Sequence, residues 1–418
     1  MTAFLFDSLS EPALVIGLFA LIGLLVQKAK VTDVVAGTFR TVLGFLILNA
    51  GVQTLANPLD IFRLVFNHAF GLKGTISSNE VVVALALKQL GAQTAWVMIL
   101  GMLFNLLLAR TTPFKYIFLT GHHTLFMACL LVAVMSAGGI TGLTLIVTSG
   151  LLLGVLMVLM PALSQPFTRR VTGHDHFALG HFGSIGYIFA ALIGQIFGKR
   201  GLSTEDIKVP ESLLFLRDTS ISMALAMSLL FMVVSLIAGP AFVERALSGG
   251  TNFLVFSVKQ ALVFSAGVYI ILAGVRLLIS EIIPAFKGIS DKLIPNAKPA
   301  LDCPSVFPFA PNAVVIGFMS SFIGGLLTMF VTPAFGLAVI VPGLIPHFFT
   351  GATAGVYGNA TGGLRGAVLG AFGNGILISF LPAMLLSGLG AIGFAGTTFG
   401  DADFGVVGIL LSFATRAF

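Results

Sequence analysis

The sequence predicts an all-α integral membrane protein built from two copies of one unit, and three observations support this. Of its 418 residues, 57% are hydrophobic and only 9% are charged, whereas a soluble domain averages roughly 25% charged residues. Apolar runs of about 20 residues, the length that crosses a bilayer, recur along the chain. Three segments of the first third recur in the last third at nearly one offset. A soluble globular domain is excluded, since this chain could not cover its surface in water.

We expect about ten or eleven crossings, some of them broken or re-entrant. The predicted crossings are residues 12–28, 38–56, 92–110, 115–134, 139–164, 184–199, 219–239, 258–284, 312–331, 335–349 and 362–388, with 403–418 as a partial one. The runs 184–199 and 335–349 are short enough for re-entrant segments. The first run is expected to be a transmembrane helix rather than a signal peptide, because no Lys or Arg precedes it.

The internal duplication is read from three matches. LGFLILNAGV at 43–52 aligns with AGVYIILAGV at 266–275, an offset of 223. GGITG at 138–142 aligns with GGLRG at 362–366, and LMPAL at 159–163 with FLPAM at 380–384, at offsets of 224 and 221. Internal repeats are typical of secondary transporters, which bind substrate where the copies meet.

We therefore interpret the chain as a single membrane domain, 1–418, in four parts. They are a first repeat at about 38–165, a connector at about 166–257, a second repeat at about 258–388 and a C-terminal tail, 389–418. An odd number of crossings in each repeat would invert the second copy, the arrangement that supports alternating access. In the connector, Ser203 followed three residues later by Asp206 predicts a helix start.

Charge and short motifs exclude several functions. The net charge of +6 is better explained by basic loops on the cytoplasmic side than by nucleic-acid binding, although the basic clusters do not agree on one orientation. Cys129 and Cys303 are expected to be free thiols. No HExxH, CxxC or phosphate-binding loop is present, so we expect no metal, no nucleotide and no other cofactor.

Ionisable groups within the membrane are costly, so each is a candidate for a binding site. The repeat offset sets Asp302 against Asn79 and Cys303 against Glu80, in stretches interrupted by Ser or Pro. Broken backbone at membrane depth persists only where it lines a cavity or is buried in protein. An ordinary surface loop is the alternative for both stretches, and the sequence leaves it open.

The histidines divide into two kinds. His122 and His123 follow a break between apolar runs, and His181 opens another run, so each is a candidate for ligand binding or simply for capping a helix. The HDH run at 174–176 is expected to lie in a solvated loop rather than to bind a metal.

Several runs carry a resemblance to a known family. They are TGH at 120–122, GH at 180–181, STEDIKVPES at 203–212, AFKGISDKLIPNA at 285–297, DC at 302–303 and FAPNAVV at 309–315. With them the chain, from about residue 15 to 390, resembles the membrane (IIC) component of bacterial phosphotransferase-system ascorbate permeases.

The resemblance implies a homodimeric inner-membrane transporter of about eleven helices, with a substrate-carrying core that moves like an elevator against a scaffold. A separate IIB protein, supplied by IIA, would phosphorylate the substrate, so this chain would hold no catalytic residue. The substrate contacts that the resemblance implies are Asn79, Glu80, His122, His123, Thr124, Leu125, Phe126, His181, Phe182 and Asp302.

The chain departs from the family pattern at three of these positions. Phe126 and Phe182 stand where the ascorbate binders have Gln, and Glu80 adds a carboxylate to a pair that is neutral in the family. The loss of two amides removes hydrogen-bond partners for a polyhydroxylated ligand, which weakens discrimination. The two rings are expected to pack against a flat ligand, whose identity the sequence leaves open.

Three functions remain in view. The first is a transporter of a small polar, sugar-acid-like substrate, coupled to phosphorylation by IIB. The second is a secondary transporter independent of the phosphotransferase system, in which Glu80, Asp302 and the histidines carry a coupling proton. The third is a sensor on the same scaffold, which a measured flux would exclude.

Replacement of Glu80 by Gln separates the first two functions. If protons are coupled through this carboxylate, Glu80→Gln should flatten the pH dependence of uptake, because the amide does not titrate. Uptake measured in proteoliposomes between pH 5 and 8 checks this. A pH profile identical to that of the wild type would count against proton coupling at Glu80.

Overall fold

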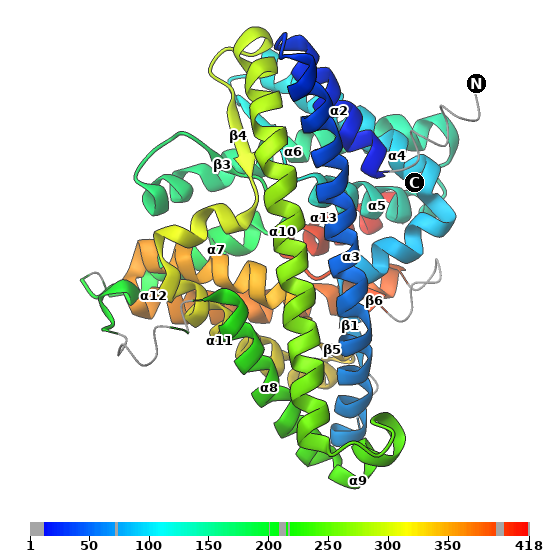
Figure 1. The fold of residues 1–418 in the computed structure, drawn as a ribbon, viewed down its shortest axis with the longest axis vertical. Helices are drawn as coiled ribbons and strands as arrows, with labels where there is room; N and C mark the ends of the chain where they lie inside the picture. Colours follow the sequence, from blue (N-terminus) through cyan, green and yellow to red (C-terminus); the bar gives the residue numbers. More distant parts are fainter. Residues whose placement is uncertain are drawn as a thin grey trace. The chain divides into compact units, whose positions relative to one another are not determined.

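The computed structural model describes residues 12–71, 74–199, 201–208, 215, 218–389 and 397–416. The chain forms two compact units. Unit 1 comprises Met1–Thr41, Thr75–Ile207 and Ser280–Phe418, and unit 2 comprises Val42–Gly74 and Lys208–Ile279. Two long helices, α3 (Val31–Phe70) and α10 (Phe253–Leu293), each contribute to both units (Figure 1).

The prediction of an all-α membrane protein is confirmed. Within the described ranges, five helices are long and apolar enough to cross a bilayer, or six if one bent pair counts as a span. The five are Val31–Phe70, Gln89–Thr111, Gly142–Thr172, Pro311–Phe335 and Leu344–Leu386. Shorter apolar helices are Gly121–Ala137, Ser184–Phe197, Phe253–Gly267 and Ala402–Thr415. The expected total of ten or eleven crossings stays a prediction.

The described residues of unit 2 are mostly helical. Besides parts of α3 and α10 it holds α8 (Thr219–Ala238), α9 (Pro240–Phe242) and η3 (Val243–Leu247). The chain bends by 98° after α8, where Gly239 adopts a φ of +94° and Pro240 begins the next turn. A Cβ at Gly267 would lie 3.1 Å from the carbonyl oxygen of Gly51, so glycine permits the close contact of α3 and α10.

Most of unit 1 consists of two series of elements in the same order. The first series, after α3, is β1 (Thr75–Ser77), α4 (Asn79–Thr111), β2 (Tyr116–Phe118), α5 (Gly121–Ala137), α6 (Gly142–Thr172), β3 (Ala178–Leu179) and α7 (Ser184–Phe197). The second, after α10, is β4 (Lys298–Leu301), η4 (Cys303–Phe309), α11 (Pro311–Val331), η5 (Thr332–Phe335), β5 (Ile340–Val341), α12 (Leu344–Leu389), β6 (Thr397–Thr398) and α13 (Ala402–Arg416). Outside the series lie α2 (Pro12–Val26) and η1 (Thr204–Asp206).

The helix α12 is a hairpin of two limbs rather than one straight rod. Gly362 and Gly363 leave helical φ/ψ values, and a Cβ on Gly358 would overlap the carbonyl oxygen of Gly366. In a straight helix those two residues would be about 12 Å apart, so the chain reverses at the glycine pair. The limbs therefore correspond to α5 and α6, which are joined at Gly139 with a φ of +86°.

The strands form two small parallel sheets that interleave the two series. One sheet has the order β5-β1-β6 and the other β2-β4-β3. In the first, Ile76 pairs with Val341 and Thr397; in the second, Ala300 pairs with Phe118 and Ala178. Each central strand thus belongs to one series, and both of its neighbours belong to the other.

This pairing brings helix starts together. The ends of parallel strands align, and a helix begins within five residues of the end of each of these strands. The first sheet therefore leads into α12, α4 and α13, and the second into α5, η4 and α7. On the outside of the unit, large apolar side chains such as Leu107, Leu151 and Ile323 are exposed, as is typical of helices in contact with lipid.

The reversal in α12 can be tested at Gly363. Its φ of +62° with ψ of −157° is a region nearly restricted to glycine, and a Cβ there would overlap the carbonyl oxygen of Leu202. We expect Gly363→Ala to cost more than about 2 kcal/mol of stability. The midpoint of thermal unfolding in detergent measures this.

The matched control is Gly139→Ala at the corresponding turn. Gly139 also has a positive φ, but a Cβ there meets nothing within 4 Å, so we expect only the backbone strain of about 1–2 kcal/mol. Equal losses of stability in the two variants would contradict the close contact at Gly363.

Candidate functional site

The candidate site lies in unit 1, where the strands end and helices begin. Most of the residues expected from the sequence are within the first turns of α4, α5 and η4 or just before α7. Helix N-termini carry unpaired N–H groups and about half a positive charge each. Their convergence makes a centre that favours negatively charged groups.

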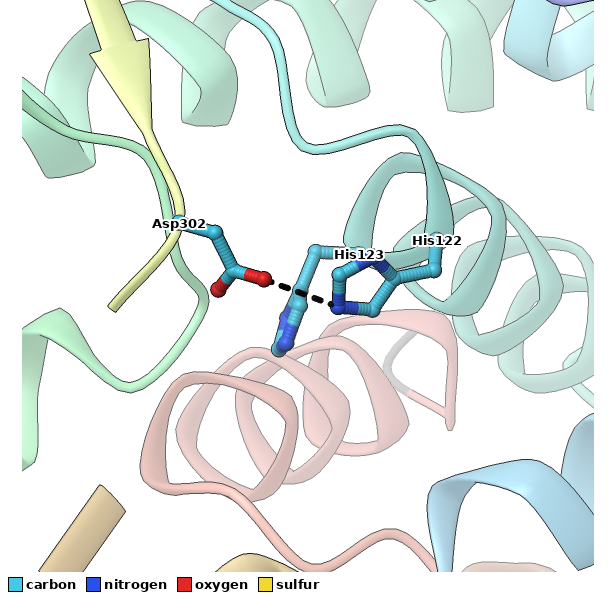
Figure 2. A group of neighbouring side chains, drawn as sticks. All are labelled: His122, His123 and Asp302. Atoms are coloured by element: carbon cyan, nitrogen blue, oxygen red, sulfur yellow. Dashed lines mark ion pairs between the residues drawn. The ribbon is translucent and has the colours of Figure 1, made fainter. Parts of the chain in front are cut away.

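Asp302 ends β4 and caps η4. Its Oδ1 accepts a hydrogen bond of 2.7 Å from the Cys303 N–H, which fixes the carboxylate. Its Oδ2 lies 3.5 Å from Nε2 of His122, and Oδ1 lies 3.8 Å from Nε2 of His181. Figure 2 shows His122 on α5 facing Asp302 at the end of β4. Asp302 is 5% exposed, so this carboxylate is largely withdrawn from water.

His123, in the next position of α5, points to a different carboxylate. Its Nδ1 accepts a hydrogen bond of 3.3 Å from the Phe182 N–H, and its Nε2 lies 4.0 Å from Oδ2 of Asp401. Because Nδ1 is an acceptor, the proton of the neutral ring belongs on Nε2. The rings of His123 and His181 lie 3.6 Å apart between centroids, so the histidines form one buried cluster.

Two hydrogen bonds fix His181, one at its ring and one at its backbone carbonyl. The Tyr187 hydroxyl lies 2.7 Å from Nδ1, and the Ser184 hydroxyl donates to the His181 carbonyl at 2.9 Å. Both partners come from the start of α7. This arrangement leaves Nε2 of His181 directed at Asp302.

Asn79 does not contact Asp302 as a direct partner. Its Nδ2 donates to Asp401 at 2.8 Å, and its Oδ1 accepts from the Gly400 N–H at 2.8 Å. The repeat offset aligned Asn79 with Asp302 as equivalent positions; in the structure, contacts through Asp401, His123 and His181 connect the two. The Glu80 residue lies in α4, but its side chain is outside the part of the chain that the structure describes.

Sequence reasoning missed two buried carboxylates before and within α13. Asp401 contacts Asn79 and His123, and Asp403 accepts from the N–H groups of Ser184 at 3.1 Å and Ile185 at 2.8 Å, which caps α7. The available signal was two acidic residues in an otherwise apolar tail. The rule applied to Asp302, that an ionisable group at membrane depth marks a site, applies to them equally.

The aromatic side chains are placed differently from one another. Phe126 lies with its ring edge-on to His122, at 5.7 Å between centroids. Phe182 has no exposed surface and stacks on Phe118 at 4.8 Å. Thr124 bonds its own helix through the Thr120 carbonyl. Leu125, like Thr124, is buried.

Two of the sequence runs that carry the resemblance, STED and PNA, connect η1 to the start of α11. Glu205 accepts from the N–H groups of Asn312 and Ala313 and so caps α11. The predicted helix start at Ser203 and Asp206 is confirmed as a capping box. Asn312 donates to the Thr204 carbonyl at 3.0 Å, so the STED and PNA runs hold each other.

Asp175, in the HDH run, forms ion pairs with two basic side chains. Lys298 and Arg169 both reach its Oδ2, the latter at 2.9 Å, and Gln165 donates to Oδ1 at 2.6 Å. Burial opposes ionisation, but these partners outweigh it and lower the pKa of Asp175 from 3.8 to about 2. Because Lys298 begins β4, the cluster ties the strand that carries Asp302 to the end of α6.

Comparison with known proteins agrees with the membrane architecture. The family model described as EIIC-GAT, PTS system sugar-specific permease component, matches residues 7–403. A curated relative, the ascorbate-specific PTS system EIIC component of Mycoplasma pneumoniae (strain ATCC 29342 / M129 / Subtype 1), is 28% identical over 413 residues. The match covers 85% of this chain, which spans 62% of the length of that relative.

The Asp175 cluster predicts a pH-dependent contribution to stability. A carboxylate whose pKa falls from 3.8 to about 2 on folding stabilises the fold above pH 4, and that contribution is lost as the pH falls through 2. We expect Asp175→Asn to unfold at a lower temperature than the wild type at pH 7. The gap in thermal midpoint should narrow below pH 4.

The control for this measurement is Asp60→Asn, at an exposed carboxylate paired with Arg63 at 3.3 Å. The thermal midpoint of Asp60→Asn should stay close to that of the wild type, because exposed ion pairs contribute little to stability. A gap for Asp175→Asn that stays constant down to pH 2 would show that the ionised carboxylate is not what stabilises the fold.

Proposed function

Because this chain belongs to the family of sugar-specific permease components of the phosphotransferase system, we propose that it transports a small, sugar-acid-like anion into the cell. Ascorbate is the first candidate, since the relative in Mycoplasma pneumoniae is named for it. A separate IIB protein, with IIA, phosphorylates the substrate. The observation that carries the proposal is the cluster of Asp302, His122 and His181 among converging helix N-termini.

The charge of the site favours an anion with hydroxyl groups. Helix N-termini attract negative charge, and broken helices near the membrane midplane are where transporters bind anionic groups. Imidazole N–H groups of His122 and His181 donate to the anion, and Asp302 accepts from hydroxyls. Charge-assisted bonds in a dry site are strong, so few residues suffice.

The remaining expected contacts take supporting roles in this proposal. The His122 side chain, 19% exposed, is more open than those of His181 and Asp302, and Phe126 packs edge-on beside it. Thr124 and Leu125 shape the first turns of α5. Asn79 orients Asp401, and Glu80 and Phe182 remain proposed contacts.

In this proposal, the two duplicated halves let the site open alternately to the two sides of the membrane. The recurring element order and the interleaved sheets support two repeats, of about 31–197 and 253–416, longer than those first expected. We propose that the second is inverted in the membrane. Unit 1, which holds the site, acts as the moving core, and unit 2 acts as the scaffold of a homodimer in the inner membrane.

The second candidate function is proton-coupled transport without IIB. It is favoured by one observation, the series of titratable side chains that runs from the partly exposed His122 through the buried Asp302, His181 and His123 to Asp401. Such a series can exchange a proton when a substrate enters.

Uptake measured in cells distinguishes transport coupled to phosphorylation from transport coupled to protons. Phosphoenolpyruvate-dependent uptake, with the phosphorylated product inside, is expected if IIB acts on the substrate. Uptake that a protonophore abolishes in cells lacking the phosphotransferase enzymes would instead establish the second candidate.

The binding role of Asp302 is tested by Asp302→Asn. Loss of a charge-assisted bond costs about 1.5–3 kcal/mol, so we expect affinity for ascorbate or a related acid to fall at least tenfold while the dimer stays intact. Calorimetry on purified protein measures affinity, and light scattering measures the dimer. Asp60→Asn, at an exposed site, is the matched control. Unchanged affinity in Asp302→Asn would remove this residue from the site.

A further inference from the structure

We propose that His181, Asp302 and Cys303 form a binding site for a divalent transition-metal ion of the Zn²⁺ class, built around the thiol of Cys303. One donor atom from each of these three residues lies within 4.8 Å of the donor atoms of the other two. The three come from the loop before α7 and from the junction of β4 and η4, so no sequence motif joins them. Binding of the ion is independent of the transport function proposed above, and only its competition with the substrate rests on that function.

The spacing of the donor atoms fits such an ion. Nε2 of His181 lies 3.8 Å from Oδ1 of Asp302, and the backbone N–H of Cys303 donates to the same oxygen at 2.7 Å. A tetrahedral zinc ion with bonds of about 2.0–2.3 Å places neighbouring ligand atoms about 3.3–3.6 Å apart. From separations within 4.8 Å, an inward movement of each donor atom by less than about 1 Å therefore brings all three onto one ion.

The charges of the three groups balance the charge of the ion. Asp302 is 5% exposed and Cys303 has no exposed surface, so both are withdrawn from water. A thiolate and a carboxylate supply two negative charges to a divalent cation, and His181 adds a neutral donor. The complex has no net charge, which avoids the cost of an uncompensated carboxylate at membrane depth.

The types of ligand select the class of ion. Thiolate and imidazole are the ligands that suit Zn²⁺, whereas Mg²⁺ and Ca²⁺ prefer oxygen ligands alone. The positive ends of the surrounding helices oppose a cation, but Asp302 and Asp403 already accept from the N–H groups at the starts of η4 and α7.

Binding of the ion releases the thiol proton of Cys303. The S–H bond breaks, the bond between sulfur and the ion forms, and the proton goes to the solvent, because the thiolate and not the thiol is the ligand. His181 binds as a neutral ring. The Tyr187 hydroxyl, 2.7 Å from Nδ1 of His181, accepts the proton of that nitrogen and leaves the lone pair of Nε2 for the ion.

Two neighbouring histidines are not ligands in this proposal. His122 approaches Oδ2 of Asp302, at 3.5 Å, and not the Oδ1 atom that faces His181 (Figure 2). His123 also has donor atoms near other possible ligands, but its Nδ1 accepts from the Phe182 N–H and its Nε2 then carries the proton. Because the side chain of His122 is 19% exposed, the ion reaches Asp302 past this residue.

Cys303 separates binding of the ion from binding of the substrate. His181 and Asp302 are proposed substrate contacts, so the ion and the substrate compete for these two side chains, whereas the thiol of Cys303 is not a substrate contact. Cys129, the other cysteine of the chain, is also free and fully buried, but no group of close metal-ligating atoms among the described residues includes it. It is therefore the matched control.

The test is calorimetric titration of purified full-length protein, without a histidine tag, with Zn²⁺ in buffers that differ in protonation enthalpy. A parallel titration with Co²⁺ is followed by absorption. We expect one site per chain in the wild type, release of a proton on binding and a charge-transfer band from sulfur to Co²⁺. Cys303→Ser, which keeps the backbone N–H to Asp302, should lose both signals, and Cys129→Ser should keep both.

Tyr187→Phe tests the orientation of His181, since this variant keeps all three ligands and removes only the hydroxyl at Nδ1. Zn²⁺ affinity should fall about 10–100-fold in Tyr187→Phe. It should fall at least as far in Cys303→Ser, with the folding of each variant checked by its thermal midpoint. Absence of a Zn²⁺ site in the wild type, or a Co²⁺ band that persists in Cys303→Ser, would overturn the site. Equal losses in Cys129→Ser and Cys303→Ser would do the same.

The outcomes separate this proposal from the transport function. Wild-type protein that binds ascorbate but no Zn²⁺ would overturn the metal site alone, and protein that binds Zn²⁺ through sulfur but no ascorbate would overturn the proposed substrate alone. Zn²⁺ at ten times its Kd should weaken ascorbate binding about tenfold in the wild type. The same Zn²⁺ should have little effect in Cys303→Ser. Unaltered ascorbate affinity in the wild type would refute the competition.

Discussion

The pairing of each central strand with two strands of the other half is the constraint on which the site depends. Only β4, held between β2 and β3, brings Asp302 to the start of α5 and to the loop before α7. These short parallel ladders also pair backbone N–H and C=O groups of both series within the protein. A chain in which each half paired only with itself would leave Asp302 and His122 without this common meeting point.

Interrupted helices create a second demand, because each new N-terminus exposes unpaired N–H groups. The protein meets it with side chains from distant parts of the sequence. Asp403 caps α7, and Glu205 caps α11. These two carboxylates satisfy the N–H groups at the starts of α7 and α11. The start of α5, which holds His122 and His123, has no side-chain cap, so its N–H groups stay available to a ligand.

The sequence runs that carry the family resemblance fall in two different places of the structure. The STED and PNA runs build the joint between η1 and α11, whose value is structural. The TGH, GH and DC runs instead supply His122, His181 and Asp302 to the candidate site. Phe126 and Phe182, which depart from the family pattern, both contact the histidines of this cluster.

The sequence by itself determined the membrane class, from composition, and located two glycine turns, from local matches such as those at 138–142 and 362–366. It also singled out Asp302, His122, His123 and His181, since a polar group among apolar residues is visible without coordinates. Only the tertiary structure decided the partners: Asn79 bonds Asp401, and Asp302 faces His122 and His181. An offset aligns equivalent positions of two copies, whereas contacts are set by strand register across the copies, through hydrogen bonds between segments far apart in the chain.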